Sequence, residues 1–236
     1  MVPLRLVSQT GLAPASAGAG PPVSAAGAVF GLTSGLEEAT VPGGPGAAAG
    51  LGFWLARAAA GGERMIAVVA PRNWFAERGG LSARGARRFG VEPGRLLLVK
   101  PRTEAEVLWA MEEILRSGAA DLALGAAEAA SLTQTRRLDM AARLSGACAG
   151  LIRVGAGGGL SAARRRWAVR PLASGPDPWD ARAPGRPRWR AQLLRRRDGP
   201  PGMWDLEWND ETGRLDLVEG LAGDSLGETA RAVAAG

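Results

Sequence analysis

One glycine-rich stretch of the chain has the outline of a loop that could bind phosphate. Residues 41–58 read VPGGPGAAAGLGFWLARA, in which glycines lead into an apolar, alanine-rich helix. A working phosphate loop has the pattern G-x-x-x-x-G-K-[ST]: its amides surround the phosphates, its lysine holds their charge and its hydroxyl binds Mg²⁺. With the frame started at Gly44, the second glycine is Ala49, the lysine position is Gly50 and the hydroxyl position is Leu51. This pattern predicts a degenerate nucleotide loop, with no ATPase activity and no cofactor.

A second candidate for chemistry is the segment from Ser161 to Arg197, in which only Asp177 and Asp180 oppose many arginines. Arginines at this density can neutralise phosphates, and tryptophans among them can stack on bases or anchor a protein partner. Tryptophans at alternating strand positions can instead cover a core, and alternate arginines of a strand point to opposite faces. Both interpretations stay open here. The candidate partner or DNA surface comprises Arg164, Arg165, Arg166, Arg188, Arg190, Arg195, Arg196, Arg197, Trp189 and Trp204.

The residue types that the chain lacks exclude several classes of enzyme. The 236 residues include no histidine, so a Ser-His-Asp triad and histidine metal ligands are excluded. The single cysteine, Cys148, lies in the apolar run SGACAGLIRV, where we expect a buried, unreactive thiol rather than a nucleophile. No apolar run reaches the length of a membrane span. We therefore expect a cytoplasmic protein with no metal site and no catalytic residue.

Strands and helices alternate through the middle of the chain. Apolar or strand-like runs occur at 37–41, 65–70, 96–100, 121–125 and 149–155. Helical patterns occur at 50–60, 81–90, 104–117 and 133–146. The helix 104–117 is the clearest, because Thr103 and Glu106 have the spacing of a capping box and Gly118 follows as a stop. Strands alternating with helices of this length predict an α/β fold with a mainly parallel sheet flanked by helices.

After residue 155 the sequence changes to alternating polar and apolar residues. The runs are RRRWAVRPL, RWRAQLLRRR, MWDLEWND and RLDLVE, with DGPPG as a turn between the middle two. This alternation predicts C-terminal antiparallel strands that extend one edge of the sheet. The expected organisation is a low-complexity, poorly ordered N-terminus (1–28), one domain (29–220) and a flexible or short helical tail (221–236).

With this order of elements, the middle of the chain resembles the core of RecA-family ATPases. The resemblance lies in RRFGVEPGRLLLVKPRTEAEVLWAMEEILRSGAADLALG, residues 87–125. More specifically, VKPRTEAEVLWAMEEILRSGA, TQTRRLDMAARLSG, SAARRRWAV and PRWRAQLLRRRDGPPGMWDLEWND resemble the ImuA family. These are RecA-like accessory proteins of bacterial damage-inducible mutagenesis, and they are also related to the SulA division inhibitors. The resemblance covers roughly residues 28–220 and implies a degenerate RecA-like domain.

Against the RecA pattern, three further positions have lost the chemistry of nucleotide hydrolysis. Gly125 stands where a strand would end on a metal-linked acid, and Ala70-Pro71-Arg72 stands where the catalytic glutamate is expected. Val154-Gly155 replaces polar residues that sense the γ-phosphate. Because phosphoryl transfer depends on positioned charge and metal, these losses also predict a protein that is not an enzyme.

The resemblance implies a non-catalytic adaptor in SOS-type translesion DNA synthesis. ImuA-like proteins act with ImuB, a polymerase relative without catalysis, and with an error-prone DNA polymerase similar to the replicative one. Contact with RecA is a further implied partnership, and contact with DNA would be weak or indirect. Two alternatives stay open: a DNA-binding module that uses the Arg/Trp-rich strands, and a SulA-like inhibitor of cell division.

Overall fold

The protein is described here from a computed structural model that covers residues 29–218 except Ala60, Gly79, 156–158 and Ala181. The predicted N-terminal segment 1–28 and the tail 221–236 lie outside the described residues. The helices are α2 Pro45–Ala59, α3 Arg72–Arg78, α4 Ala83–Arg88, η1 Pro93–Arg95, α5 Glu104–Ser117 and α6 Leu132–Ser145. The strands are β1 Gly35–Val41, β2 Met65–Val69, β3 Leu96–Val99, β4 Ala120–Ala126, β5 Cys148–Val154, β6 Arg165–Leu172, β7 Arg188–Arg196, β8 Gly202–Asn209 and β9 Arg214–Leu217.

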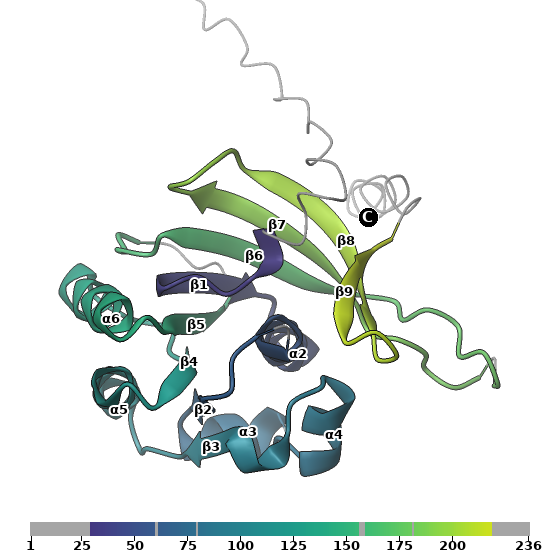
Figure 1. Ribbon diagram of the computed structural model, residues 1–236, viewed down its shortest axis with the longest axis horizontal. Coiled ribbons are helices and arrows are strands. Elements are labelled where there is room, and N and C mark those ends of the chain that lie inside the picture. The colour runs from purple at the N-terminus through teal and green to yellow at the C-terminus, as the bar shows by residue number, and fades with distance from the viewer. Residues whose placement is uncertain (1–28, 60, 79, 156–158, 181, 219–236) are drawn as a thin grey trace, which may run out of the picture.

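All these strands form one mixed sheet in the order β3-β2-β4-β5-β1-β6-β7-β8-β9 (Figure 1). Neighbours from β3 to β6 run parallel, and neighbours from β6 to β9 run antiparallel. The predicted fold class is therefore confirmed. One detail differs: β6 itself is parallel to β1, so the antiparallel extension begins one strand later than the alternating sequence pattern suggested.

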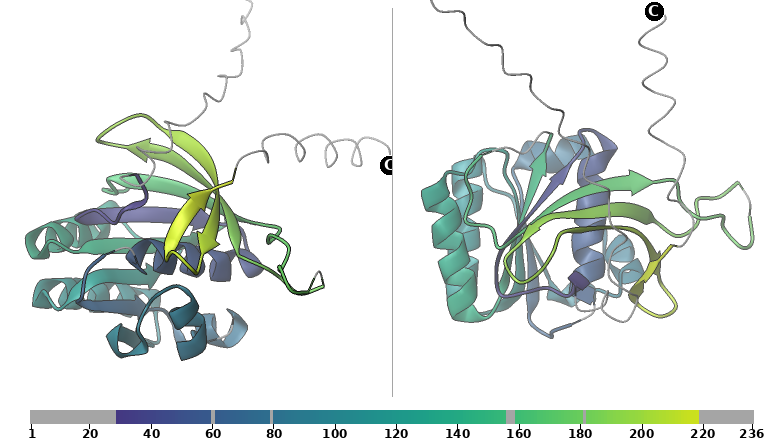
Figure 2. Two further views of the ribbon diagram at one scale, coloured as in Figure 1. Left: turned by 45° about the vertical axis from the view of Figure 1, so that its right-hand side comes forward. Right: turned by 90° about the horizontal axis from the view of Figure 1, so that it is seen from above.

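The helices cover both faces of the parallel half. Helices α5 and α6 lie on one face, and α2, α3 and α4 lie on the other (Figure 1). The antiparallel strands curl over α2, as both views of Figure 2 show, so this half of the sheet closes the α2 side of the core. That side holds the large aromatic residues Trp54, Trp167, Trp189, Trp204 and Trp208. The α5/α6 side is packed with alanine, leucine and valine.

Helix ends follow local capping chemistry, with one correction to the predicted box at α5. The Thr103 side chain accepts a hydrogen bond from the Glu106 amide, as predicted, and Gly118 adopts the left-handed conformation with φ 69°. The Glu106 carboxylate, however, accepts from the Arg102 amide at 2.7 Å instead of the Thr103 amide. A complete capping box is found at α6, where Ser131 and Gln134 exchange both hydrogen bonds.

The sequence pattern missed α3 and placed the start of α2 too late. Helix α3 is short, and it buries Trp74 and Phe75 directly after the strand β2. Helix α2 begins at Pro45 instead of residue 50, because proline is well suited to the first helical position and alanines follow it. Within residues 29–218, as far as they are described, no helix has the length and apolar character needed to cross a bilayer.

Candidate functional site

The glycine turn after β1 is too short to surround a phosphate. Strand β1 ends at Val41 and α2 begins at Pro45, so only Pro42, Gly43 and Gly44 lie between them. Gly44 has φ 62°, a left-handed conformation that lets the chain reverse directly into the helix. Most of the frame predicted for a phosphate loop is therefore helical, and its amides are not gathered around an anion site.

The positions that would hold lysine and hydroxyl point into the protein. A Cβ atom added to Gly50 would lie 2.7 Å from Val41 Cγ1, because α2 packs closely on β1 at this point. Leu51 is buried in the core, and Ala49 is half-buried with its carbonyl bonded to the indole of Trp189 at 2.9 Å. Glycine at position 50 thus has a packing role, and a lysine side chain there would collide with the sheet.

At the carboxyl ends of β2, β4 and β5, the residues that replace the expected catalytic groups pack against neighbouring elements or lead into turns. A Cβ atom at Gly125 would lie against Met111 Sδ of α5, so a larger side chain at this position requires the Met111 side chain to move. Ala70 is buried at the end of β2, and Pro71-Arg72 leads into α3. Val154 is half-buried and is followed by Gly155 in a left-handed turn with φ 90°.

A small cavity remains at the carboxyl ends of β2, β4 and β5, the usual place for a ligand in an α/β sheet. It has a volume of about 220 Å³. Its lining includes Glu77, Glu104 and Glu128 with Arg78 as the cation. Glu104 also accepts hydrogen bonds from the amides of Glu128 and Ala129. An excess of carboxylates disfavours phosphate, and these acids form no cluster that could hold a metal within the described part of the chain.

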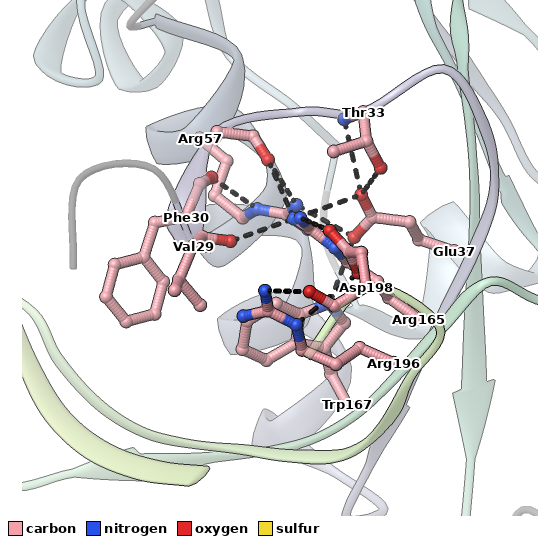
Figure 3. A network of polar contacts seen from close by, with 10 residues as sticks. Val29, Phe30, Thr33, Glu37, Arg57, Arg165, Trp167, Arg196 and Asp198 are labelled. Carbon is pink, nitrogen blue, oxygen red and sulfur yellow. Dashed lines mark hydrogen bonds and ion pairs between the residues drawn. The ribbon is translucent and has the colours of Figure 1, made fainter. Parts of the chain in front are cut away.

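On the α2 side of β1, Glu37 is the centre of a buried polar cluster (Figure 3). Its carboxylate accepts from Arg57 at 2.8 Å, from the Trp167 indole at 3.0 Å and from the Thr33 hydroxyl at 2.7 Å. The side chains of Glu37 and Arg57 have 0% exposure. Arg57 also donates to the carbonyl oxygens of Phe30 and Gly31, so it fixes the chain that enters β1.

The opposite face of β1 carries a matching cluster around Glu38. Its carboxylate accepts from Arg153 at 2.9 Å and from the Ser161 hydroxyl at 2.6 Å, and it lies 3.4 Å from Arg166 Nε. The pairing of β1 with β6 places Glu37 opposite Arg165 and Glu38 opposite Arg166. Adjacent residues of a strand face opposite sides of the sheet. The consecutive acids of β1 and the consecutive arginines of β6 therefore fix the register of these two strands on both faces of the sheet.

Arg165 is therefore corrected from a surface residue to a buried one. It is 4% exposed and donates to the carbonyl of Val29 at 2.9 Å and to Asp198 at 3.1 Å. Asp198 begins the turn between β7 and β8, so this arginine ties that turn to the chain before β1 (Figure 3). The pKa of Asp198 lies below its ordinary value: partial burial raises it, but the hydrogen bond and charge of Arg165 and the charge of Arg196 outweigh burial.

Two of the predicted surface arginines are neutralised by acids on the next strand. Arg188 lies opposite Glu207, and Arg190 lies opposite Asp205, in the register of β7 with β8. The Arg188–Glu207 distance is 2.6 Å, and Arg190 binds both oxygens of Asp205 at 2.7 Å. The hydrogen bond to Asp205 raises the pKa of Arg190 further. These arginines remain on the outer face of the sheet, but with their charge matched.

Trp189 and Trp204 are the clearest correction to the predicted surface. They are 2% and 6% exposed, because the curl of the antiparallel strands turns this face toward α2 and α4. The Trp189 indole bonds to the Ala49 carbonyl, and the ring of Trp204 meets Phe30 edge-on at 5.3 Å. The core interpretation of these tryptophans is confirmed, and neither ring is available for stacking on a base.

The remaining arginines gather near the end of β7. Arg195 and Arg197 are exposed and form no ion pair with any residue that the structure describes, whereas Arg196 pairs with Asp198. Arg164 and Arg166 are half-buried at the start of β6. The cationic surface is thus smaller than the sequence suggested. Among the described arginines of the predicted set, Arg195 and Arg197 are the exposed ones without an ion pair, and the half-buried Arg164 has none either.

Cys148 is buried at the start of β5, and burial raises the pKa of its thiol well above the ordinary value. A thiol that stays protonated in an apolar setting is a poor nucleophile, as expected.

Sequence reasoning missed the two buried clusters on β1. The signal was available, because Glu37-Glu38 interrupt a strand and Arg57 interrupts the apolar helix GFWLARAAA. Charged residues at positions expected to be buried need partners, and arginines elsewhere in the chain were the available partners.

The strand order, the turn at the end of β1 and the helices on both faces define a RecA-like α/β core. The crystal structure of the RadB recombinase supports this class, with a TM-score of 0.55 over 80% of this chain and 92% of that chain. At 15% identity this likeness shows the fold alone. The crystal structure of SulA from Pseudomonas aeruginosa is 26% identical over 51% of this chain and 98% of that chain, but its TM-score of 0.41 carries no argument.

Within that class, the chain is a homologue of the protein ImuA from Caulobacter vibrioides, in the strains NA1000/CB15N and ATCC 19089/CB 15. It is 38% identical to ImuA of each strain over 144 residues, which is 57% of this chain and 59% of the relatives. The chain therefore spans about three fifths of the length of the curated relatives that it matches. The resemblance to ImuA predicted from the sequence is confirmed. No protein-family model matches the chain.

Proposed function

We propose that the protein is a non-catalytic, RecA-like adaptor in damage-inducible, error-prone translesion DNA synthesis. The observation that carries this proposal is the packing of α2 on β1 in a homologue of ImuA, with Gly50 against Val41 where a RecA-type ATPase would place its lysine. Leu51 in the core and Met111 against Gly125 support the same conclusion from two other elements.

A protein without a phosphate cradle has to act through its surfaces. The partners that we propose are an ImuB-like protein and an error-prone DNA polymerase, with RecA as a further partner. The exposed pair Arg195 and Arg197, at the end of the β7–β8 hairpin, is the part of the predicted surface that remains available. Arginine is favoured at the anchors of protein interfaces, where it can bind carboxylates in a bidentate geometry.

The alternative function, a DNA-binding module, is favoured by these same two exposed cations. The Arg188–Glu207 and Arg190–Asp205 pairs remove charge from the face that would meet phosphates, and the buried tryptophans remove the stacking platform. We propose that any contact with DNA is weak and lost at moderate salt. No contact among the described residues favours the division-inhibitor alternative.

The test is damage-induced mutagenesis in the organism that carries the gene. Deletion should abolish the rise in mutation frequency after DNA damage, and the wild-type gene should restore it. Affinity purification from damaged cells should recover the ImuB-like protein and the error-prone polymerase. Unchanged mutagenesis in the deletion strain, or recovery of the tubulin-like division protein instead, would overturn the proposal.

A further inference from the structure

The loop between β6 and β7 presents one tryptophan to solvent. Residues 173–180 and 182–187 project from the body in both views of Figure 2, on the side where β9 lies. Trp179 in this loop is 94% exposed, in contrast with the six tryptophans that pack in the core. A large aromatic side chain in water loses the free energy that its burial would contribute, and tryptophan is enriched at the centres of protein interfaces.

The loop is ordered by its own hydrogen bonds. The Asp177 carboxylate accepts from the amides of Trp179 and Asp180 at 2.9 and 3.0 Å. At the base of the loop, the Gly185 amide donates to the Gly175 carbonyl at 3.2 Å, and a Cβ on Gly185 would lie 2.4 Å from that oxygen. These bonds restrain the backbone beside Trp179, which lowers the entropy that this residue loses on binding.

An apolar groove of about 470 Å³ lies at the base of the same loop. One wall is the outer side of α2, including Ala48 and Leu55, and another is formed by Leu81 and Phe89 at the two ends of α4. The loop contributes Pro184. The volume is within the range of pockets that hold small molecules, and the lining is almost free of charge, so an indole ring fits its size and chemistry.

The charges around the two features are complementary. Trp179 is flanked by Asp177 and Asp180. Of the two arginines farther along the loop, Arg186 pairs with Asp210 and Glu211, and Arg182 is exposed. Beside the groove, α4 carries three exposed arginines, Arg84, Arg87 and Arg88, which form no ion pair within the described residues. A tryptophan between two carboxylates therefore matches an apolar groove with a basic rim.

We propose that the occupant of the groove is the Trp179 loop of a second copy of this chain. Both complementary features lie on one molecule and next to each other, so a two-fold pair can form both contacts at once: each Trp179 enters the groove of the other copy. Such an isologous pair is closed and does not grow into a filament. The proposal does not depend on the proposed role in mutagenesis.

The test is sedimentation equilibrium of the full chain over a range of concentrations and salt. The wild type should show a monomer–dimer equilibrium that weakens with salt. Trp179→Ala should weaken the dimer about thirtyfold or more, the effect of removing an interface anchor, with an unchanged melting temperature. Ala48→Glu, at an exposed position of the groove, should do the same. Trp109→Ala, a control that removes another exposed tryptophan on α5, should leave the dimer unchanged.

A mixture of the two variants separates this proposal from general loss of solubility or fold. Trp179→Ala retains the groove and Ala48→Glu retains the tryptophan, so an equimolar mixture should form mixed dimers through one of the two contacts. Mixed dimers at higher affinity than either variant alone support the exchange. A monomeric wild type at every concentration, or a dimer that survives Trp179→Ala, overturns it.

Discussion

Arg57 and Glu37 form an ion pair with no exposure to solvent, with Arg57 Nη2 at 2.8 Å from Glu37 Oε2. The pair lies between the end of helix α2 and the beginning of strand β1, at the opposite end of both elements from the turn that would bind phosphate in a RecA-type ATPase. Arg57 also lies over the ring of Trp54, at 4.7 Å from its centroid. The pair therefore joins the entering chain, the central strand and the aromatic core.

Glu37→Ala should destabilise the protein by about 3–5 kcal/mol, because it leaves a buried guanidinium without its counter-charge. Urea denaturation monitored by circular dichroism measures this. Glu113→Ala is the matched control, since Glu113 pairs with Arg116 at an exposed site, and it should change the free energy of unfolding by less than about 0.5 kcal/mol. Equal effects of the two substitutions would contradict the structural importance of the pair.

Trp204→Ala should cost about 3–5 kcal/mol, because a buried indole leaves a large cavity next to Phe30 and Trp167. Thermal denaturation gives the shift in melting temperature. Trp179→Ala provides the comparison, and it should leave the melting temperature within error since that ring is 94% exposed. An unchanged melting temperature of the Trp204→Ala variant would contradict the core role of Trp204 and favour a role as an exposed interface anchor.

The purified protein should hydrolyse no ATP above background, with or without single-stranded DNA. Gly50→Lys should not create activity, and it should also lower stability because position 50 faces Val41. Phosphate release and the melting temperature are measured on the same preparations, with an active RecA-type ATPase as positive control. DNA-stimulated hydrolysis that persists after repurification would contradict this expectation.

Arg195→Glu and Arg197→Glu together should weaken capture of the ImuB-like partner without affecting the melting temperature. They should also reduce the slope of log binding constant against log salt concentration for any DNA binding, by the amount expected for about two phosphate contacts. Arg102→Glu is the control, because that arginine is also exposed but follows β3, the edge strand at the other end of the sheet from β7. Partner capture and mutagenesis that survive both reversals would exclude this surface from the proposed function.

We expect the folded protein to lose stability in acid because of Asp198. Its pKa is lowered in the folded protein by Arg165 and Arg196 despite the opposing effect of burial. A carboxyl group with a lowered pKa stabilises the folded state above its unfolded pKa of about 4, and this contribution is lost as the pH falls through the folded value. Asp198→Asn should be less stable than the wild type at pH 7 and should lose less on acidification. Parallel pH-dependent urea titrations of both proteins measure the difference.

Most of the fold could be predicted because its signals are local. A few consecutive residues determine each of these signals, as in the apolar runs of β2 and β4 and the caps of α5. The site could be predicted only where it depends on missing residue types, such as the absent lysine at position 50. Neither the burial of Arg165 nor the pairing of Arg190 with Asp205 is local, since each depends on the register of strands that the sequence does not state. The exposed half of the basic segment therefore could not be separated from the buried half.

The central position of β1 has a consequence for how the chain folds during synthesis. Its two neighbours, β5 and β6, begin at Cys148 and Arg165, so more than a hundred residues must leave the ribosome before β1 can pair on both sides. At ordinary rates of translation this delay is on the order of ten seconds. During that time an apolar strand with free edges would be prone to aggregate, and charged residues within a strand counteract this tendency. Glu37 and Glu38 thus protect the nascent strand first. Glu37 gains a counter-charge once Arg57 of α2 has been made, whereas Glu38 is neutralised only when Arg153 of β5 and Arg166 of β6 follow.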